Sequence, residues 1–254
     1  MLSRRTLTLG LVATAISSCV RKDIDSYVIA GESDMSGRGL LNEYARPITP
    51  FEIFTSKYRW VDGGLNVDGI GDLQGSPSYD EISGLGPGVS FAGAVAKSSG
   101  GKPIGLIPCA KGGSTINDWQ PSQSDKTLYG SMVSRAKAGG KVKAILWMQG
   151  KNDVNDPDAA LGWGSKFREI VSSARKDIGI SALPIVMAAI GNPVGVKQTH
   201  WQAIRDQQLA FEMDGVTVID TFDLEAKQGD PIHLGTAAQI ILGARFADAV
   251  QRFV

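Results

Sequence analysis

A serine directly after a short β-prone run is the first residue of this chain whose type and position suggest chemistry. Ser33 follows the apolar residues 27–30 and Gly31, and a second glycine, Gly37, stands shortly after it. Glycines at these places permit a tight exit from a strand. A serine at the carboxyl end of a strand in an open α/β sheet lies where such folds bind their ligands. The stretch predicts either a nucleophile at Ser33 or a helix-capping turn, which is the commoner role of such a string.

A serine hydroxyl needs a base to accept its proton, and the chain contains 2 histidines that could serve. His200 opens a predicted helix, where a surface or capping role is expected. His233 lies in a loop before the last predicted helix, on the same short segment as Asp230. An Asp-x-x-His spacing can bring the carboxylate to the imidazole Nδ1 and leave Nε2 free for the serine. Ser33, Asp230 and His233 are therefore the predicted catalytic residues, although Asp230 before Pro231 also fits a simple turn.

The oxyanion of a tetrahedral intermediate needs fixed hydrogen-bond donors. The Ser33 backbone amide is one candidate. The amides of Gly112 and Gly113 are others, because no Cβ hinders the approach of a ligand there. The side-chain amides of Gln149 and Asn152 follow the third predicted strand. These groups make up the predicted oxyanion hole.

Strands and helices alternate along the chain, which is typical of a parallel sheet covered by helices on both faces. Five strands are predicted at residues 27–30, 103–108, 142–148, 183–190 and 216–219, and helices at 89–97, 128–138, 159–178, 200–212 and 236–253. Polar, glycine-rich loops follow the first three strands, so they are expected to meet at one edge of the sheet. Residues 40–85 contain one strand-like run, 52–61, and otherwise predict a loop system that covers the site.

The composition predicts one globular domain with a sizeable core. The chain has 254 residues, 43% of them hydrophobic, and 26 basic residues balance 26 acidic ones. This balance gives no sign of a nucleic-acid partner.

The first residues predict an export signal. Arg4 and Arg5 precede the apolar residues 7–16 and a Ser-Ser-Cys sequence that ends at Cys19. The pattern resembles a twin-arginine signal followed by a lipobox, and about ten apolar residues are too few to cross a bilayer, which needs about 20. We expect a signal peptide at residues 1–18, a single domain at 19–254 and a lipid on Cys19. The protein would then be a periplasmic or cell-surface lipoprotein of a bacterium, which contacts the membrane only through this anchor.

If Cys19 carries a lipid, Cys109 is the only other cysteine and no disulfide is possible. Cys109 ends an apolar run, so it is expected to be a small buried hydrophobic residue.

Four blocks of the sequence together resemble the SGNH hydrolases, and within them the sialate O-acetylesterase-like enzymes and family 6 carbohydrate esterases. Residues 30–39 resemble the Gly-Gln-Ser-Asn-Met block that holds the nucleophile, and 108–116 resemble the glycine oxyanion block. Residues 146–153 resemble the Trp-x-Gln-Gly-Glu-Ser-Asp block, and 230–233 resemble the Asp-x-x-His block. Four such blocks in the right order are a strong signal.

The resemblance implies a fold and a reaction. The fold would be a three-layer α/β/α sandwich with a five-stranded parallel sheet of flavodoxin-like topology. The reaction would be removal of O-acetyl groups from carbohydrates, of the acetylxylan or sialic-acid type, without a metal or an organic cofactor. Ser33 would be the nucleophile, His233 the base and Asp230 the residue that orients it.

The resemblance also ranks the side-chain oxyanion donors. Gln149 comes first, and Asn152 is its rival because Gly-Lys-Asn-Asp at residues 150–153 matches a Gly-x-Asn-Asp block of the wider superfamily. Trp119, just after the glycine block, could offer a stacking face to a sugar ring or belong to the core.

Three residues depart from the family pattern. Glu32 and Asp34 stand where the family usually has Gln and Asn, and Lys151 replaces the usual Glu. Negative charge beside the nucleophile would oppose the formation of an oxyanion. We expect Lys151 to offset it through a salt bridge to Glu32 or Asp34. Two alternatives stay open: a general short-chain ester hydrolase, and a catalytically weakened carbohydrate-binding module on the same scaffold.

Overall fold

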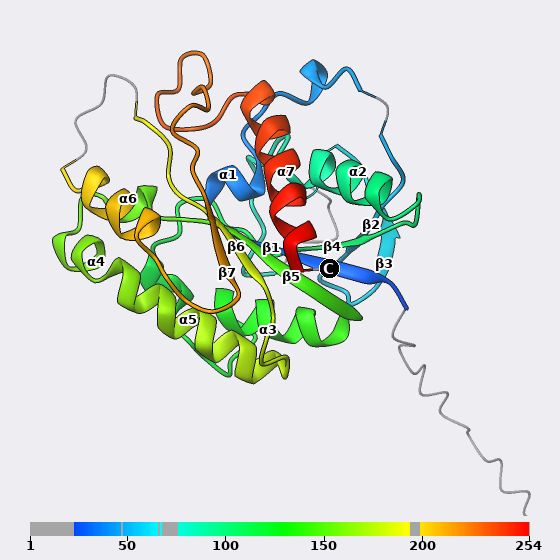
Figure 1. Ribbon diagram of the computed structural model, residues 1–254, viewed down its shortest axis with the longest axis horizontal. Helices are drawn as coiled ribbons and strands as arrows, with labels where there is room; N and C mark the ends of the chain where they lie inside the picture. The colour runs from blue at the N-terminus through cyan, green and yellow to red at the C-terminus, as the bar shows by residue number, and fades with distance from the viewer. Residues whose placement is uncertain (1–22, 47, 66, 68–75, 194–198, 254) are drawn as a thin grey trace, which may run out of the picture.

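A seven-stranded sheet runs through the centre of the computed structural model in the order β3-β2-β4-β1-β5-β6-β7 (Figure 1). The structure describes residues 23–46, 48–65, 67, 76–193 and 199–253. β3 runs antiparallel to β2, and every other neighbouring pair is parallel. The strands are β1 (Asp25–Gly31), β2 (Glu52–Phe54), β3 (Trp60–Asp62), β4 (Gly105–Pro108), β5 (Lys141–Met148), β6 (Ile185–Ala188) and β7 (Val216–Ile219).

The five predicted strands correspond to the contiguous block β4-β1-β5-β6-β7, which has the 2-1-3-4-5 order of flavodoxin-like sheets. The predicted number of strands is wrong, because residues 52–61 fold as a hairpin that adds β2 and β3. The hairpin closes where the Thr55 N–H donates to the Arg59 carbonyl (2.9 Å) and Tyr58 takes a positive φ of 57°. β2 joins the edge of the block by pairing in parallel with β4.

Helices cover the sheet on both faces. They are α1 (Ser33–Ser36), α2 (Gly88–Ser98), α3 (Leu128–Ala138), α4 (Pro157–Leu161), α5 (Trp163–Ile178), α6 (Trp201–Leu209) and α7 (Thr236–Val250). α2 packs against α7 on one face, and α3 packs against α5 on the other (Figure 1). The helix predicted at 200–212 is shorter in the structure, where α6 spans Trp201–Leu209. The α-helix predicted at 236–253 ends at Val250 and continues as a short 3₁₀ turn, Gln251–Phe253.

The predicted helix at 159–178 is two helices, because the chain breaks at Gly162. The Asp156 side chain caps α4 by accepting hydrogen bonds from the Asp158 (3.0 Å) and Ala159 (3.1 Å) backbone N–H groups. The predicted apolar spacing holds within α5, where Trp163, Phe167, Ile170, Val171 and Ala174 are all buried.

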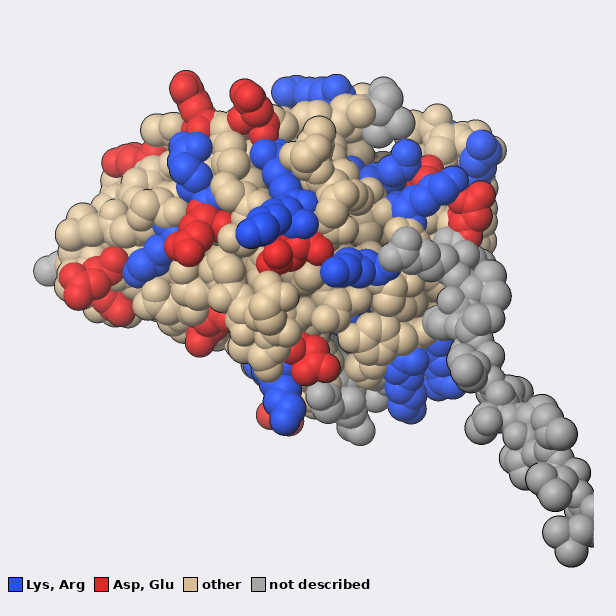
Figure 2. Space-filling view, turned by 90° about the horizontal axis from the view of Figure 1, so that it is seen from below, with Lys and Arg blue, Asp and Glu red and all other residues tan. Residues whose placement is uncertain are grey.

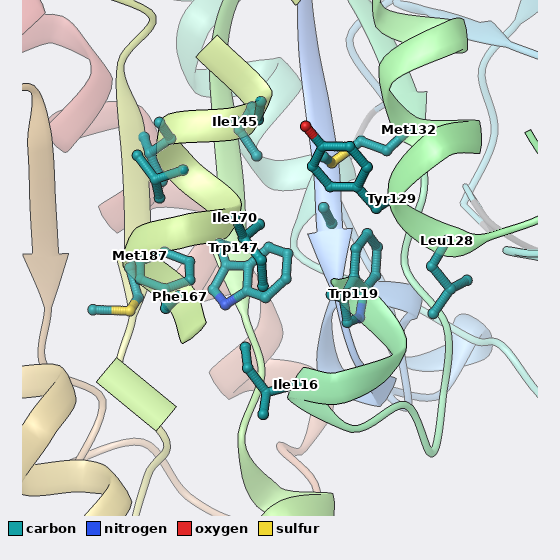
Figure 3. Packing of buried hydrophobic residues seen from close by; sticks show 14 of the residues in the cluster. Ile116, Trp119, Leu128, Tyr129, Met132, Ile145, Trp147, Phe167, Ile170 and Met187 are labelled. Atoms are coloured by element: carbon teal, nitrogen blue, oxygen red, sulfur yellow. The ribbon is translucent and has the colours of Figure 1, made fainter. Parts of the chain in front are cut away.

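Alternate side chains of β1 enter two hydrophobic clusters. Val28 and Ala30 belong to the cluster under α3 and α5, which Figure 3 shows, and Tyr27 and Ile29 belong to the cluster under α2 and α7. Complete burial of a large apolar side chain contributes about 1.5–3 kcal/mol. The two clusters therefore fix the central strands rigidly, and with them the loops at their carboxyl ends.

Charged side chains of both signs lie interspersed over most of the surface seen in Figure 2. None of the helices in the described ranges combines the length and apolar character that crossing a membrane requires. The predicted signal peptide at residues 1–18 and Cys19 lie outside the described residues. Cys109 is buried, as predicted.

Candidate active site

Ser33 is the first residue of α1, which follows β1 after a sharp turn. Gly31 ends β1 with a φ of 120°, and a Cβ there would collide with the Met148 carbonyl oxygen, so only glycine fits. The Glu32 N–H donates to the Met148 carbonyl (2.9 Å), and the Lys111 N–H donates to the Gly31 carbonyl (3.0 Å). The loops after β1, β4 and β5 therefore meet at one edge of the sheet, as predicted.

His233 and Asp230 form a hydrogen-bonded pair. The His233 Nδ1 lies 2.7 Å from the Asp230 Oδ2. The other carboxylate oxygen accepts hydrogen bonds from the backbone N–H groups of Ile232 and His233, both at 3.3 Å. Burial opposes ionisation of Asp230, but the hydrogen bond and the electrostatic interaction with the His233 side chain hold the pKa of Asp230 below the ordinary value. With Nδ1 donating to the carboxylate, Nε2 is left as a proton acceptor.

Ser33 and His233 line the same pocket, which has a volume of about 440 Å³. Gly112, Gly113 and Asn152 contribute to its wall. A larger cavity of about 690 Å³ lies at the opposite edge of the sheet, around the start of β1, and contains none of the predicted site residues. Within the described ranges, no group of three or more His, Cys, Asp and Glu side chains is arranged to hold a metal ion.

The two glycines of the predicted oxyanion loop differ in what their amides do. The Gly112 N–H donates to the Asp80 carboxylate (3.0 Å), so this donor is already engaged. Gly113 adopts a positive φ of 76°. Among the described residues, no hydrogen bond engages the backbone N–H of Gly113 or of Ser33. These two amides are the backbone donors that a ligand in the pocket could receive.

Gln149 is fully buried, and both ends of its side chain are engaged in the core. Its Nε2 donates to the Ser114 carbonyl (3.1 Å) and to the Asp153 carboxylate, and its Oε1 accepts from the Trp163 indole (2.9 Å). Asn152 lines the pocket instead, and its Nδ2 donates to the Gly113 carbonyl. The structure therefore places Asn152, and not the higher-ranked Gln149, where a ligand can reach it.

Trp119 is fully buried, so its ring has no face to offer a sugar. Its indole packs edge-on against Trp147, with ring centroids 4.9 Å apart (Figure 3). The Trp119 Nε1 donates to the Ser114 Oγ (3.1 Å). Of the two roles predicted for Trp119, packing in the core is the one found. The stacking prediction is wrong because the short helical turn Ile116–Trp119 buries the indole in the hydrophobic cluster that also contains Trp147.

Asp34 and Lys151 form a buried ion pair between the Asp34 Oδ2 and the Lys151 Nζ, which confirms the predicted salt bridge. The Asp34 Oδ1 also accepts from the Leu234 N–H (3.0 Å) and from the Gln239 Nε2 (3.2 Å). The negative charge of Asp34 is thus neutralised within the protein.

Glu32 is the second acid beside the nucleophile, and it holds the loop after β5. Its Oε1 accepts hydrogen bonds from the backbone N–H groups of Gly150 (3.0 Å) and Lys151 (2.7 Å). Burial raises the pKa of Glu32 to about 7, and the nearby Lys151 charge only partly opposes this effect. An ionised carboxylate at this position therefore lowers the stability of the folded protein, whereas an uncharged side-chain amide would not.

Asp80 is a site residue that the sequence reasoning missed. One oxygen of its carboxylate accepts from the Ser36 hydroxyl (2.7 Å), the Arg38 guanidinium (2.8 Å) and the Gly112 N–H. Burial opposes ionisation, but the hydrogen bonds from Arg38 and Ser36 hold the pKa of Asp80 below the ordinary value. Asp80 belongs to the predicted covering segment 40–85, and no motif in the sequence marks it.

Comparisons with known proteins identify the family of this chain. Residues 23–252 match the family described as carbohydrate esterase, sialic acid-specific acetylesterase. The "Probable carbohydrate esterase At4g34215" of Arabidopsis thaliana is 30% identical over 246 residues, which cover 88% of each protein. Its crystal structure superposes with a TM-score of 0.80 at 28% identity and covers 92% of this chain and 100% of its own.

Two further structures share the fold. NanS has a TM-score of 0.70 at 16% identity and covers 91% of this chain and 98% of its own. The carbohydrate acetylesterase XAC1771 of Xanthomonas citri has a TM-score of 0.66 at 19% identity, over 90% of this chain and 56% of its own. The chain therefore belongs to the carbohydrate esterase, sialic acid-specific acetylesterase family, and it is a carboxylic ester hydrolase.

Proposed function

We propose that this chain removes O-acetyl groups from carbohydrates through a Ser33–His233–Asp230 triad. The observation that carries the proposal is the hydrogen-bonded Asp230–His233 pair on the wall of the pocket that also contains Ser33. The position of Ser33 at the carboxyl end of β1 and the family membership of the chain support it.

In the first half of the reaction, the Ser33 Oγ attacks the acetyl carbonyl carbon and its proton passes to the His233 Nε2. Asp230 stabilises the imidazolium that forms. The carbonyl oxygen becomes an oxyanion, for which the free N–H groups of Ser33 and Gly113 and the Asn152 Nδ2 are the donors. The bond to the sugar oxygen then breaks, and the sugar leaves with the proton from His233.

In the second half, a water molecule attacks the acetyl group on Ser33 while His233 accepts its proton. The ester bond to Ser33 breaks, Ser33 recovers a proton from His233, and acetate is released. Both halves use the same donors, so loss of one oxyanion donor is expected to lower kcat by roughly 10²–10³-fold.

Charged side chains in the wall of the pocket favour a carbohydrate over a plain apolar ester. Arg38, Asp80, Glu81 and Lys111 line it beside the nucleophile. Charged groups of both signs form hydrogen bonds with sugar hydroxyls, whereas a long acyl chain gains nothing from them.

A substrate panel tests the proposal. A chromogenic acetate ester, its butyrate analogue, acetylated xylan and acetylated sialic acid are offered to the wild type and to Ser33→Ala. We expect faster release from acetate than from butyrate, release from at least one acetylated carbohydrate, and loss of all activity in Ser33→Ala. Equal rates on acetate and butyrate with no release from either carbohydrate would favour a general esterase. An intact acetate ester at high protein concentration would favour a binding module.

We also propose that the protein is exported and held at a membrane by a lipid on Cys19. The twin-arginine-like sequence and the lipobox-like sequence that ends at Cys19 support this proposal. Cys19→Ser is expected to move the protein from the detergent phase to the aqueous phase in a partition experiment, and an unchanged distribution would contradict the anchor.

A further inference from the structure

The two residues that flank Ser33 each hold a different loop of the site. Glu32 accepts both backbone N–H groups at Gly150 and Lys151, so it fixes the loop after β5. Asp34 accepts the Leu234 N–H (3.0 Å), so it fixes the loop that carries His233. The turn that carries Ser33 is thus hydrogen-bonded both to the loop after β5 and to the loop that carries His233.

Lys151, in the loop after β5, contacts both the turn that carries Ser33 and the loop that carries His233. The Lys151 Nζ pairs with the Asp34 Oδ2 and donates to the Ile232 carbonyl (2.7 Å). Ile232 and Leu234 are the residues immediately before and after His233. The backbone on one side of His233 is therefore held by Lys151, and the backbone on the other side by Asp34.

We propose that Asp34 and Lys151 are positioning residues of the esterase reaction, which set the His233 imidazole relative to the Ser33 hydroxyl. This inference rests on the proposed function. It assigns a role to the two departures from the family pattern, which pair an acid with a base where the family usually has Asn and Glu. In this chain the negative charge gained at position 34 is balanced by the positive charge gained at position 151.

Burial makes the pair interdependent. The Asp34 side chain is 0% exposed and the Lys151 side chain 4%. Removal of one partner leaves an uncompensated charge that cannot reach water, and the loop it holds must shift to solvate that charge. Removal of both charges together avoids this strain, and the side-chain amide introduced by Asp34→Asn still offers an oxygen to the Leu234 N–H.

A double-mutant cycle tests the pair. Asp34→Asn, Lys151→Met and the double variant are assayed for kcat and KM on the chromogenic acetate ester. Arg205→Met is the matched control, because it removes another buried cation from an ion pair with Asp220, and the hydrogen bonds of Arg205 go to Ile190 and Asp220 and not to the loops that hold His233 and Asn152. Lys151→Arg keeps the charge and is expected to retain kcat within about fivefold.

We expect each single variant to lower kcat about 10- to 100-fold with KM within about threefold, because a displacement of about 1 Å has such an effect. The kcat of the double variant should be at least about tenfold higher than that of Lys151→Met, and the kcat of Arg205→Met should stay within about twofold of the wild-type value. Wild-type kcat in the folded single variants, or losses that multiply in the double variant, would overturn the proposal. If a single variant does not fold, Lys151→Arg decides the proposal. A kcat about 100-fold below that of the wild type would contradict the proposal, and a kcat close to that of the wild type would support it.

A second readout does not depend on turnover. The chain has 2 histidines, so the hydrogen-bonded Nδ1 proton of His233 can be assigned in NMR spectra with a His200→Gln variant. We expect this signal to shift or broaden in Lys151→Met and to return in the double variant. A signal unchanged in Lys151→Met would overturn the positioning role. This readout decides the proposal even if the wild type hydrolyses none of the esters, an outcome that would refute the proposed function alone.

Discussion

Replacing Glu32 with Gln should stabilise the folded protein in neutral solution and leave its stability unchanged in acid. The Glu32 carboxyl group is buried, and burial raises its pKa from 4.5 to about 7. The folded protein therefore binds this proton more tightly than the unfolded chain does. The free energy of unfolding falls as the pH rises from about 4.5 to about 7, and the full cost of the buried charge is present above that window.

The size of the effect follows from the pKa difference. Each pKa unit corresponds to about 1.4 kcal/mol. Ionisation of Glu32 in the folded state thus costs about 3 kcal/mol at pH 8 and less than about 0.5 kcal/mol at pH 4.5. A Gln side chain still accepts the Gly150 and Lys151 N–H groups through its oxygen, so Glu32→Gln keeps the loop contacts and removes the charge. A gain of about 3 kcal/mol corresponds to an increase in Tm of roughly 6–12 °C in a protein of this size.

Urea unfolding at pH 8 and at pH 4.5 measures this gain directly. Glu81→Gln is the matched control, because it removes an exposed carboxylate from the same pocket. The control is expected to change the free energy of unfolding by less than about 0.5 kcal/mol at both pH values. A Glu32→Gln protein no more stable than the wild type at pH 8, or equally stabilised at both pH values, would refute the reasoning.

Three further predictions concern the site. Asn152→Ala should lower kcat by roughly 10²–10³-fold without loss of Tm. Gln149→Ala should instead lower the free energy of unfolding by about 1–3 kcal/mol, because it leaves the buried hydrogen-bond partners of Gln149 unsatisfied. Equal Tm values for the two variants would contradict this assignment. Asp230→Asn should lower kcat by roughly 10³–10⁴-fold with little change in KM, and wild-type turnover would exclude Asp230 as the orienting group. Trp119→Phe should lower stability by about 1 kcal/mol by removing the hydrogen bond to Ser114, and a clear increase in KM for an acetylated carbohydrate would reopen its role in binding.

Features with a local cause could be predicted from the sequence. The central strands follow from short apolar runs, and Gly31 marks the tight exit from β1 because a Cβ cannot fit beside Met148. The Lys151–Asp34 ion pair could be expected because Asp34 stands where the family usually has Asn and Lys151 where it usually has Glu, which places opposite charges in two blocks of the same site. The break at Gly162 was missed because the apolar spacing continues on both sides of it.

Features that depend on side-chain direction could not be predicted. Gln149 and Asn152 stand three positions apart in one loop, and only the three-dimensional turn at Gly150, with a φ of 142°, decides which amide faces the pocket. Asp80 reaches the site from a segment with no periodic pattern. Trp119 follows a polar, glycine-rich loop, and its burial depends on packing against Trp147, which lies far away in the sequence.

The most direct test of the central claim is to identify the residue that attacks the substrate. An alkyl fluorophosphonate, which forms a stable adduct with an activated serine, is incubated with the wild type, Ser33→Ala and His233→Ala, and the adduct is located by peptide mass spectrometry. We predict one adduct on the peptide that contains Ser33, none in Ser33→Ala, and labelling at least about 100-fold slower in His233→Ala. An adduct elsewhere in the wild type, or labelling of His233→Ala at the wild-type rate, would contradict the assignment of Ser33 as a nucleophile activated by His233.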